Sequence, residues 1–347
     1  MELLGLTLTE LQALCAEEGF PKFVASQLCD WIYKKRVASF DAMTNLSLKA
    51  RSRLKEIATL TLSDPVETHS SSDGTKKYLF RSVISNCDGR ADDGHGFVES
   101  VFIPAEGRAT ICVSCQRGCR MGCRFCVTGQ QGFHGNLSAA EILNQIFSIP
   151  ESAELSNIVF MGMGEPMDNY DAIKRTIEVL TSPWGLGWSP HRLTVSTVGV
   201  IPMLERLLDE CQCHVAVSMH NPFAAERALM MPMEKQWPIQ AVVDLLRRYD
   251  WSGQRRISFE YTMFKGINDD IRHADGIVKL TRGLRCRVNL IRFHPSPNVP
   301  YETSKEGDMI RFRDYLSSHG ITCTIRASRG EDIMAACGLL AGTASNP

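Results

Sequence analysis

The segment CVSCQRGCRMGCRFC, residues 112–126, contains five of the thirteen cysteines in the chain. Three of them, Cys119, Cys123 and Cys126, have the spacing C-x3-C-x2-C, and a loop with this spacing can turn three thiolates toward one point. A [4Fe-4S] cluster held by only three cysteines keeps one iron free for a ligand that the protein does not supply. S-adenosylmethionine can chelate such an iron, so the spacing favours a cluster at these three residues.

Zinc is the alternative metal for the same cysteines. Closed structural zinc sites use four protein ligands. Cys112 with Cys115, and Cys123 with Cys126, form two C-x-x-C pairs of the kind found in zinc knuckles. A zinc-dependent RNA-binding protein without catalytic activity would use the segment in this way, and the spacing alone leaves both interpretations open.

The composition is that of a globular protein with a full hydrophobic core. The chain has 347 residues, 44% of them apolar, which is enough for one large and one small domain. No apolar run is long enough to span a bilayer, and the first residues, MELLGLTLTELQ, are acidic where a signal peptide is basic. We therefore expect a cytoplasmic protein with reduced cysteines and no membrane partner. The net charge of -1 neither supports nor excludes a nucleic-acid partner.

Residues 1–60 are predicted to form a small helical domain that binds RNA. Thr7 and Glu10 have the spacing of a capping box at a helix start. Apolar periodicity predicts three helices, at residues 7–19, 23–35 and 45–57. The third helix has a basic side that would contact an RNA backbone or simply face solvent, formed by Lys49, Arg51, Arg53 and Lys55.

The rest of the chain is predicted to be an α/β unit that follows a hairpin. Asp73-Gly74 is a hairpin turn signal, so we expect residues 61–96 to form a β-hairpin and a linker with a polar loop at 86–95. Beyond it, in residues 97–343, strand candidates alternate with helical patterns. The strands are expected at residues 98–103, 109–114, 158–162, 193–197, 215–220, 257–263, 288–292 and 322–326. Repeated strand-helix units predict a partial (β/α)6-type barrel with its chemistry at the carboxyl ends of the strands, where the cysteine segment falls.

The segment MGMGEPMDN, residues 161–169, is a second candidate for ligand binding. Gly162 and Gly164 would let the backbone approach a ligand closely. Glu165 can accept a hydrogen bond from an ammonium group, such as the amino group of S-adenosylmethionine. A glycine turn with a solvated glutamate is the alternative interpretation.

Several motifs together resemble one enzyme family. In chain order they are VESVFIP, CVSCQRGC, GMGEP, RLTVSTVG, AVSMH, NLIRFHP and RGEDIMAACG. They resemble the RlmN family of radical S-adenosylmethionine RNA adenine-C2 methyltransferases, from the N-terminal helices almost to the last residues. The resemblance implies a radical SAM barrel, a [4Fe-4S] cluster and S-adenosyl-L-methionine as cofactors, and 23S rRNA and tRNA as substrates. We also expect a one-electron donor such as flavodoxin, and a monomer.

The resemblance implies roles for individual residues. Cys119, Cys123 and Cys126 match the cluster ligands, and Cys337 matches the cysteine that is methylated and passes the carbon on. Cys112 matches its disulfide partner. Glu99 matches a carboxylate that accepts a proton.

Seven further positions match contacts to S-adenosylmethionine. They are Gly164, Glu165, Ser196, Ser218, Met219, His220 and His294. The sequence departs from the family pattern at two positions. Cys115 stands where relatives often have serine, which puts a further thiol beside the cluster, and His294 stands where many have asparagine.

The expected chemistry explains these residue types. C2 of adenine is electrophilic and lacks a nucleophilic electron pair, so direct methyl transfer from a sulfonium is blocked. In the family scheme one S-adenosylmethionine methylates Cys337, and a radical derived from a second one removes a hydrogen from the methylated cysteine. The carbon then adds to C2, a base removes the C2 proton, and Cys112 resolves the protein-RNA adduct by forming a disulfide with Cys337. The adenine must be unstacked to reach the barrel.

Two other enzymes remain as alternatives. A relative that methylates C8 of the same adenine shares most motifs, although TGQQGF at residues 128–133 and the proline of GMGEP resemble the C2 enzymes. A radical enzyme acting on a protein or small molecule would not need Cys112 and Cys337 together. The remaining cysteines are expected to be structural thiols, namely Cys15, Cys29, Cys87, Cys211, Cys213, Cys286 and Cys323.

Overall fold

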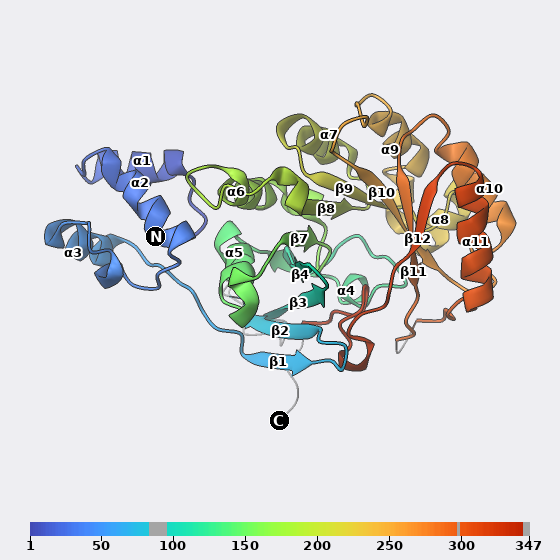
Figure 1. Ribbon diagram of the computed structural model, residues 1–347, viewed down its shortest axis with the longest axis horizontal. Coiled ribbons are helices and arrows are strands. Elements are labelled where there is room, and N and C mark those ends of the chain that lie inside the picture. The colour runs from blue at the N-terminus through green and yellow to red at the C-terminus, as the bar shows by residue number, and fades with distance from the viewer. Residues whose placement is uncertain (83–95, 297–298, 343–347) are drawn as a thin grey trace.

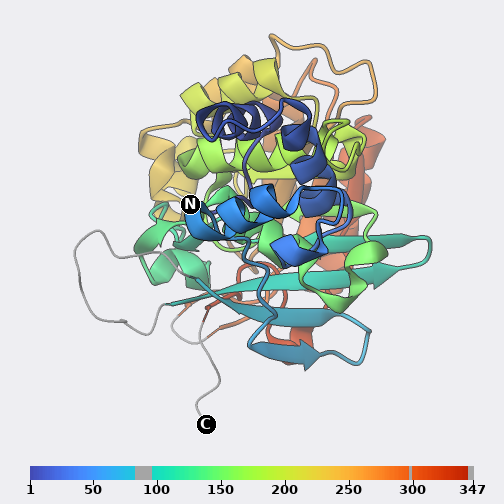
Figure 2. The same ribbon diagram turned by 90° about the vertical axis from the view of Figure 1, so that its left-hand side faces the viewer.

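The computed structural model describes residues 1–82, 96–296 and 299–342. A group of N-terminal helices stands at one end of a larger α/β unit (Figure 1) and lies in front of the sheet when the molecule is turned by 90° (Figure 2). The loop expected at residues 86–95, together with Cys87, lies outside the described residues.

The N-terminal region consists of α1 (Leu8–Glu17), α2 (Phe23–Cys29) and α3 (Leu48–Ile57). The predicted capping box is confirmed, because the backbone N–H of Glu10 donates to Thr7 Oγ1 (3.3 Å) and that of Thr7 donates to Glu10 Oε2 (2.7 Å). The prediction of one continuous α-helix through residue 35 is wrong in its last turn. Asp30–Lys34 form a π-helical turn, in which the backbone N–H of Lys35 donates to the Asp30 carbonyl (3.0 Å).

Carboxylates pair with much of the basic side of α3. Arg53 contacts Glu18 (2.6 Å), and Lys55 contacts Asp41 (2.6 Å). Arg51 donates to the backbone carbonyl of Asp41 (3.0 Å). Two of the four basic side chains predicted for this helix are therefore paired with carboxylates within the domain.

In the described residues one sheet contains ten strands in the order β1-β2-β3-β4-β7-β8-β9-β10-β11-β12. The strands β1 to β4 pair antiparallel, which confirms the hairpin at Asp73-Gly74. From β4 onward all neighbours pair parallel, as the partial barrel requires. Their bounds are β1 (Glu67–Ser70), β2 (Lys76–Arg81), β3 (Phe97–Ala105), β4 (Arg108–Cys112), β7 (Asn157–Phe160), β8 (Leu193–Thr197), β9 (His214–Ser218), β10 (Ile257–Met263), β11 (Arg287–Arg292) and β12 (Thr322–Ile325).

Helices connect and cover the parallel strands (Figure 1). A second capping box, formed by Ser138 and Glu141, begins α5. Within the described residues no helix is both long and apolar enough to cross a bilayer. The helices are α5 (Ala139–Phe147), α6 (Tyr170–Thr181), α7 (Ile201–Glu210), α8 (Ala224–Met230), α9 (Ile239–Leu246), α10 (Ile271–Leu280) and α11 (Glu306–Ser318).

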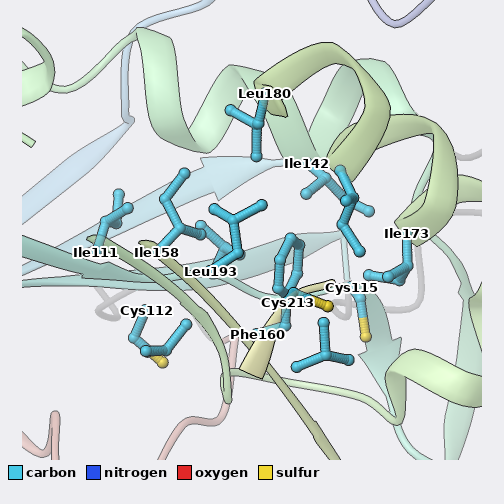
Figure 3. Packing of buried hydrophobic residues seen from close by; sticks show 14 of the residues in the cluster. Ile111, Cys112, Cys115, Ile142, Ile158, Phe160, Ile173, Leu180, Leu193 and Cys213 are labelled. Carbon is cyan, nitrogen blue, oxygen red and sulfur yellow. The ribbon is translucent and has the colours of Figure 1, made fainter. Parts of the chain in front are cut away.

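The core lies between the sheet and its outer helices. Ile111, Ile158 and Leu193 are fully buried on neighbouring strands and face Ile142 of α5 and other apolar helix residues (Figure 3). Because side chains alternate along a strand, Cys112 points to the opposite side of β4 from Ile111, as Figure 3 shows. The strand therefore places Cys112 toward the interior of the barrel.

Candidate active site

A cavity of about 160 Å³ lies at the carboxyl ends of the parallel strands. Most of the predicted site residues line it together, which is what the barrel architecture predicts. Those residues are Cys119, Cys123, Cys126, Gly164, Glu165, Ser196, Ser218, His220, His294 and Cys337. The predicted residues Cys112, Glu99 and Met219 are not part of this lining.

The cysteine loop is held in a tight fold by its own backbone. It runs from β5 (Gln116–Gly118) through α4 (Val127–Gln130) to β6 (Phe133–Asn136). The backbone N–H of Cys119 donates to the carbonyl of Gly132 (2.7 Å). Gly118 has φ +66°, and a Cβ atom there would lie 1.9 Å from the same carbonyl oxygen. A glycine is therefore required at 118 for the loop to close.

The three motif thiols border one cavity in a setting that disfavours their charge, with Cys119 buried and Cys123 and Cys126 partly buried. Burial raises the pKa of Cys119 to about 12, and it also raises the pKa values of Cys123 and Cys126. A bound metal centre would compensate, since coordination deprotonates a thiol. These thiols therefore suit a group that brings positive charge into the cavity.

The arrangement of the donors bears on which metal centre fits. Within residues 1–82, 96–296 and 299–342, no three or more His, Cys, Asp and Glu side chains are grouped so that they could hold a metal ion. The zinc knuckle considered above needs four converging ligands. A cluster of four irons and four sulfides is wider than one ion, so its cysteine ligands need only border a common cavity, as these three do. The residues fit the cluster better than zinc.

The C-terminal segment that carries Cys337 is attached to the cysteine loop. The backbone N–H of Val127 donates to the carbonyl of Gly338 (2.9 Å). The hydroxyl of Thr128 donates to the Leu340 carbonyl (2.6 Å), and the side chain of Gln131 donates to the Ala341 carbonyl (2.8 Å). These three hydrogen bonds hold the exposed thiol of Cys337 at the cavity that the motif cysteines line.

The turn between β1 and β2 holds the same C-terminal segment from its other side. The Ser71 hydroxyl (2.6 Å) and the Ser72 backbone N–H (3.1 Å) donate to the carboxylate of Asp332, and the Gly330 backbone N–H donates to Asp73 (3.1 Å). Burial raises the pKa of Asp73, but hydrogen bonds from Thr75, Gly330 and Ser71 outweigh it and lower the pKa to about 2. We call this contact between residues 71–75 and 330–332 the clasp.

Cys112 and Glu99 lie next to the Cys337 segment although they do not line the cavity. Burial, followed by the interaction with Cys337, raises the pKa of Cys112 to about 12. Glu99 Oε1 accepts from Lys77 Nζ (3.1 Å), and Oε2 accepts from the backbone N–H of Ala341 (2.9 Å). The structure therefore places all three predicted catalytic residues around one segment.

The glycines of the GMGEP motif pack against protein atoms. A Cβ atom at Gly162 would lie 2.7 Å from the Val113 carbonyl oxygen. Gly164 has φ +104°, and a Cβ atom there would lie 2.6 Å from Gln116 Cβ. Close packing against the strand that precedes the cysteine loop is therefore sufficient reason for both glycines, before any ligand is considered.

Glu165 is a buried carboxylate with a strongly altered pKa. Burial raises its pKa to about 7, although hydrogen bonds from Thr197 and from the backbone N–H groups of Val198 and Met167 oppose the shift. Its two oxygens accept from Met167 N (3.0 Å) and Val198 N (2.9 Å). A carboxylate has about four acceptor sites, so capacity remains for an ammonium group in the cavity.

His220 is held as a neutral imidazole. Its Nδ1 accepts from the backbone N–H of Thr262 (2.9 Å), which leaves the proton on Nε2. Burial, followed by the charge of Arg227, lowers the pKa of His220 to about 3. Its ring packs edge-on against Phe125 with centroids 4.8 Å apart, and its backbone has φ +54°. The histidine is a fixed hydrogen-bond donor beside the cysteine loop.

Arg227 supports the cavity through hydrogen bonds to the backbone beside it, and no sequence motif identified this residue. Its fully buried guanidinium pairs with Glu234 and donates to three backbone carbonyls, those of Val198 (3.2 Å), Ser218 (2.8 Å) and Met219 (2.9 Å). These carbonyls end β8 and β9. The Met219 side chain is itself fully buried in the core, so this residue presents backbone to its surroundings.

Two further charged residues of the cavity were also missed. Arg326 follows β12 and contacts Glu260 (3.4 Å), and its charge interacts with both Cys337 and Cys112. Glu260 and Arg326 are charged residues within or next to strand segments that are otherwise apolar, and this contrast in the sequence could have identified them.

His294 contacts the hydroxyl of Ser328 (3.0 Å), and burial lowers its pKa.

Comparison with known families defines the class of protein. Residues 113–275 match the Radical SAM superfamily, and residues 1–60 match the ribosomal RNA large subunit methyltransferase N-terminal domain. A crystal structure of a radical SAM methyltransferase from Sphaerobacter thermophilus is 39% identical, covers 99% of both chains and superposes with a TM-score of 0.89. The chain is a radical SAM methyltransferase, and this class implies a [4Fe-4S] cluster and S-adenosylmethionine as its cofactors.

Curated relatives identify the family within this class. The proteins named "Probable dual-specificity RNA methyltransferase RlmN" from Phocaeicola vulgatus and from Porphyromonas gingivalis strain W83 are each 55% identical over 97% of this chain, which covers 94% and 96% of their lengths. The "Dual-specificity RNA methyltransferase RlmN" of Syntrophus aciditrophicus is 40% identical over 98% of this chain and 96% of its own length. The chain belongs to the RlmN family of RNA methyltransferases.

Proposed function

We propose that this enzyme methylates C2 of adenine in 23S rRNA and tRNA through a methylated Cys337. The observation that carries the proposal is the attachment of the Cys337 segment to the cysteine loop by three hydrogen bonds, from Val127, Thr128 and Gln131. A carbon carrier must reach both the cofactor site and the RNA. An exposed thiol at the cavity satisfies this requirement.

The residues around the cavity would hold the cofactors. Cys119, Cys123 and Cys126 would ligate the cluster. S-adenosylmethionine would contact Gly164, Glu165, Ser196, Ser218, Met219, His220 and His294. The bound cofactors supply the methyl group and its activation by one-electron reduction.

Each polar contact has a physical basis in the chain. Glu165 would accept a hydrogen bond from the amino group of S-adenosylmethionine, and the cation would lower the raised pKa of this carboxyl. His220 would donate from Nε2. Met219 would contribute its backbone, because its side chain lies in the core.

Three residues around the Cys337 segment would complete the transfer. Cys337 loses its proton and accepts the methyl group on sulfur. Glu99, held by Lys77 and the backbone of Ala341, accepts the proton that leaves C2. The Cys112 thiol then loses its proton and its sulfur bonds to the Cys337 sulfur, while the electron pair of the broken Cys337-carbon bond stays with the carbon. That carbon takes up a proton to become the methyl group, which frees the RNA.

The cellular setting belongs to the same proposal. We infer a monomer in the cytoplasm that receives electrons from a one-electron donor such as flavodoxin. We also infer that residues 1–60 form an RNA-binding domain, residues 61–96 a hairpin and linker, and residues 97–343 the catalytic barrel domain. The match of residues 1–60 to an rRNA methyltransferase domain supports the first of these units.

Mass spectrometry of Cys337 tests the mechanism. We expect a methyl group on Cys337 in the wild type, none in C123A, and a covalent RNA adduct in C112A. C286S is the matched control, because Cys286 is partly buried and lies outside the cavity lining. An unmodified Cys337 together with no adduct in C112A would refute both cysteine roles, and 8-methyladenosine as the product would move the reaction to C8.

A further inference from the structure

Five arginines gather at the end of the barrel opposite the active site. Arg192 precedes β8, Arg255 and Arg256 precede β10, and Arg285 and Arg287 lie at the start of β11. Because these strands are parallel, their amino ends meet at one edge of the sheet. We call these five residues the arginine rim. Four of them, all except Arg192, line a cavity of about 280 Å³.

The charge of the rim is not neutralised by the protein. In the part of the chain that the structure describes, none of the five arginines has a carboxylate within 4 Å, in contrast to Arg53 and Lys55 of α3. The exposed side chains of Arg256 and Arg287 also make no hydrogen bond to the described residues. These two guanidinium groups are free to bind a ligand.

The other three arginines have partners that fix them without removing their charge. Arg255 donates to the backbone carbonyls that end α7 and precede β9, and Arg285 donates to the Ser252 carbonyl (2.8 Å). Arg192 lies over the ring of Trp188. Two carboxylates interact with the rim at longer range, Asp250 with Arg285 and Asp209 with Arg255, and each accepts a hydrogen bond from another residue. Three of the five rim guanidinium groups are therefore held in place, the other two are free, and positive side chains outnumber the carboxylates around them.

His214, at the start of β9, lies beside the arginine rim. His214 stacks on His191 with ring centroids 5.5 Å apart. Burial, then the charges of His191, Arg256, Arg255 and Arg287, lower the pKa of His214 to about 4. The positive side chains around His214 therefore form a field that favours a polyanion.

We propose that the arginine rim binds backbone phosphates of the RNA substrate, far from the target adenine. Arginine offers a planar set of donors that matches phosphate oxygens, and the rim presents several of them together. The seven residues of β10 separate the rim from the active site by about 23 Å at 3.3 Å per residue. That distance excludes contact with the reacting base, and it argues against an electron donor docking there because electron transfer weakens steeply with distance.

The inference rests on RNA being the substrate, as the proposed function states. A folded RNA larger than the protein can enter the cavity with one loop while another part of it passes the opposite end of the barrel. The rim would then add affinity and orientation without sequence recognition. It would matter for long RNA and not for a short stem-loop that carries only the target adenine.

The test compares the R256Q/R287Q variant with the wild type. Binding of a full-length tRNA transcript is measured by fluorescence anisotropy over a series of salt concentrations. Loss of two phosphate contacts should make the slope of log K against log salt shallower by about 1.4 to 1.8. The Kd at physiological salt should rise by about tenfold. Thermal unfolding should be unchanged, because neither side chain makes a contact that folding requires.

The control variant is K279Q/K305Q, which removes the same charge from α10 and the start of α11. Its slope should stay within about 0.5 of the wild type if the rim acts locally. Equal slopes for the wild type and R256Q/R287Q, or an equal loss in the control, would overturn the proposal. Binding of an acidic protein with unchanged tRNA binding would overturn it in favour of a protein partner.

Methylation of a short stem-loop separates this inference from the proposed function. Wild type and R256Q/R287Q should methylate the stem-loop equally. If the wild type methylates neither RNA, the proposed function has failed. If the wild type methylates both RNAs and the variant binds tRNA with the wild-type salt slope, only the rim proposal has failed.

Discussion

The clasp that holds the Cys337 segment predicts a specific defect in D73N. Asp73 accepts from the backbone N–H groups of Gly330 (3.1 Å) and Thr75 (2.9 Å), and its charge faces Arg329 (3.8 Å). Asparagine keeps the size of the side chain but removes the charge and half of the acceptor capacity. The substitution should loosen the segment that carries Cys337 while the barrel stays folded.

The magnitude follows from the pKa of Asp73. A fall from the ordinary value of 3.8 to about 2 corresponds to about 2.4 kcal/mol, at 1.36 kcal/mol per pKa unit. The side chain is 29% exposed, so solvent screening reduces this to about 1 to 1.5 kcal/mol. Because the folded-state pKa is depressed, the contribution is complete above pH 3.8 and is lost as the pH falls through about 2. At neutral pH the open population of the segment should rise by about five- to tenfold.

Hydrogen exchange and methylation together provide the assay. Amides of residues 330–341 should exchange about five- to tenfold faster in D73N at neutral pH, and methylation of Cys337 should slow. D64N is the matched control, because the clasp involves no contact with Asp64. Unchanged exchange in this segment would refute the reasoning, as would an equal effect of D64N. Faster exchange across the whole barrel would show that Asp73 stabilises the fold and not the segment.

Three further predictions concern the cavity itself. G118A should abolish iron and sulfide loading in anaerobic reconstitution, because its Cβ would lie 1.9 Å from the Gly132 carbonyl oxygen. G132A should still load, because a Cβ at that position meets open space. Equal loading of the two variants would contradict the steric argument. R227M should cost about 3 to 5 kcal/mol in urea unfolding because it leaves Glu234 buried and unpaired, and a loss below about 1 kcal/mol would show that the pair is dispensable. The pKa of Glu165 is raised to about 7, so the folded cofactor-free protein binds this carboxyl proton more tightly than the unfolded chain does. The stability that this proton contributes is complete below the ordinary pKa of 4.5 and is lost as the pH rises through 7. The urea midpoint of the wild type should fall over that range more than that of E165Q, and parallel curves would assign the titration elsewhere.

The sequence predicted the local features of the fold well. The capping box at Thr7 formed as expected, since it depends on two residues only three positions apart. The strand at residues 257–263 was placed within its observed bounds, because buried parallel strands read as apolar runs. The π-helical turn after Cys29 was not predicted, because no residue type distinguishes it from an α-helical turn.

Charge pairing was the weakest part of the sequence-based interpretation. Lys49, Arg51, Arg53 and Lys55 were noticed because they are close in sequence, yet Glu18 and Asp41 pair with two of them from other parts of the chain. The sequence did not indicate the arginine rim, because Arg192, Arg256 and Arg287 are far apart in the chain. Parallel strands bring them together, and among the residues that the structure describes no carboxylate lies within 4 Å of these arginines.

The same limit applies to the active site, where motifs identified ligand-facing residues but not the residues that support them. Arg227 binds the carbonyls of Val198, Ser218 and Met219, so it fixes the ends of two strands that the motif residues share. A buried arginine is stable only if its donors find acceptors, and here these are the Glu234 carboxylate and three backbone carbonyls, which carry no sequence signature. Supporting residues of this kind can be found only from the geometry. The sequence motif therefore identified Ser218 and Met219 themselves, whereas the structure shows that Arg227 holds the backbone carbonyls of these two residues.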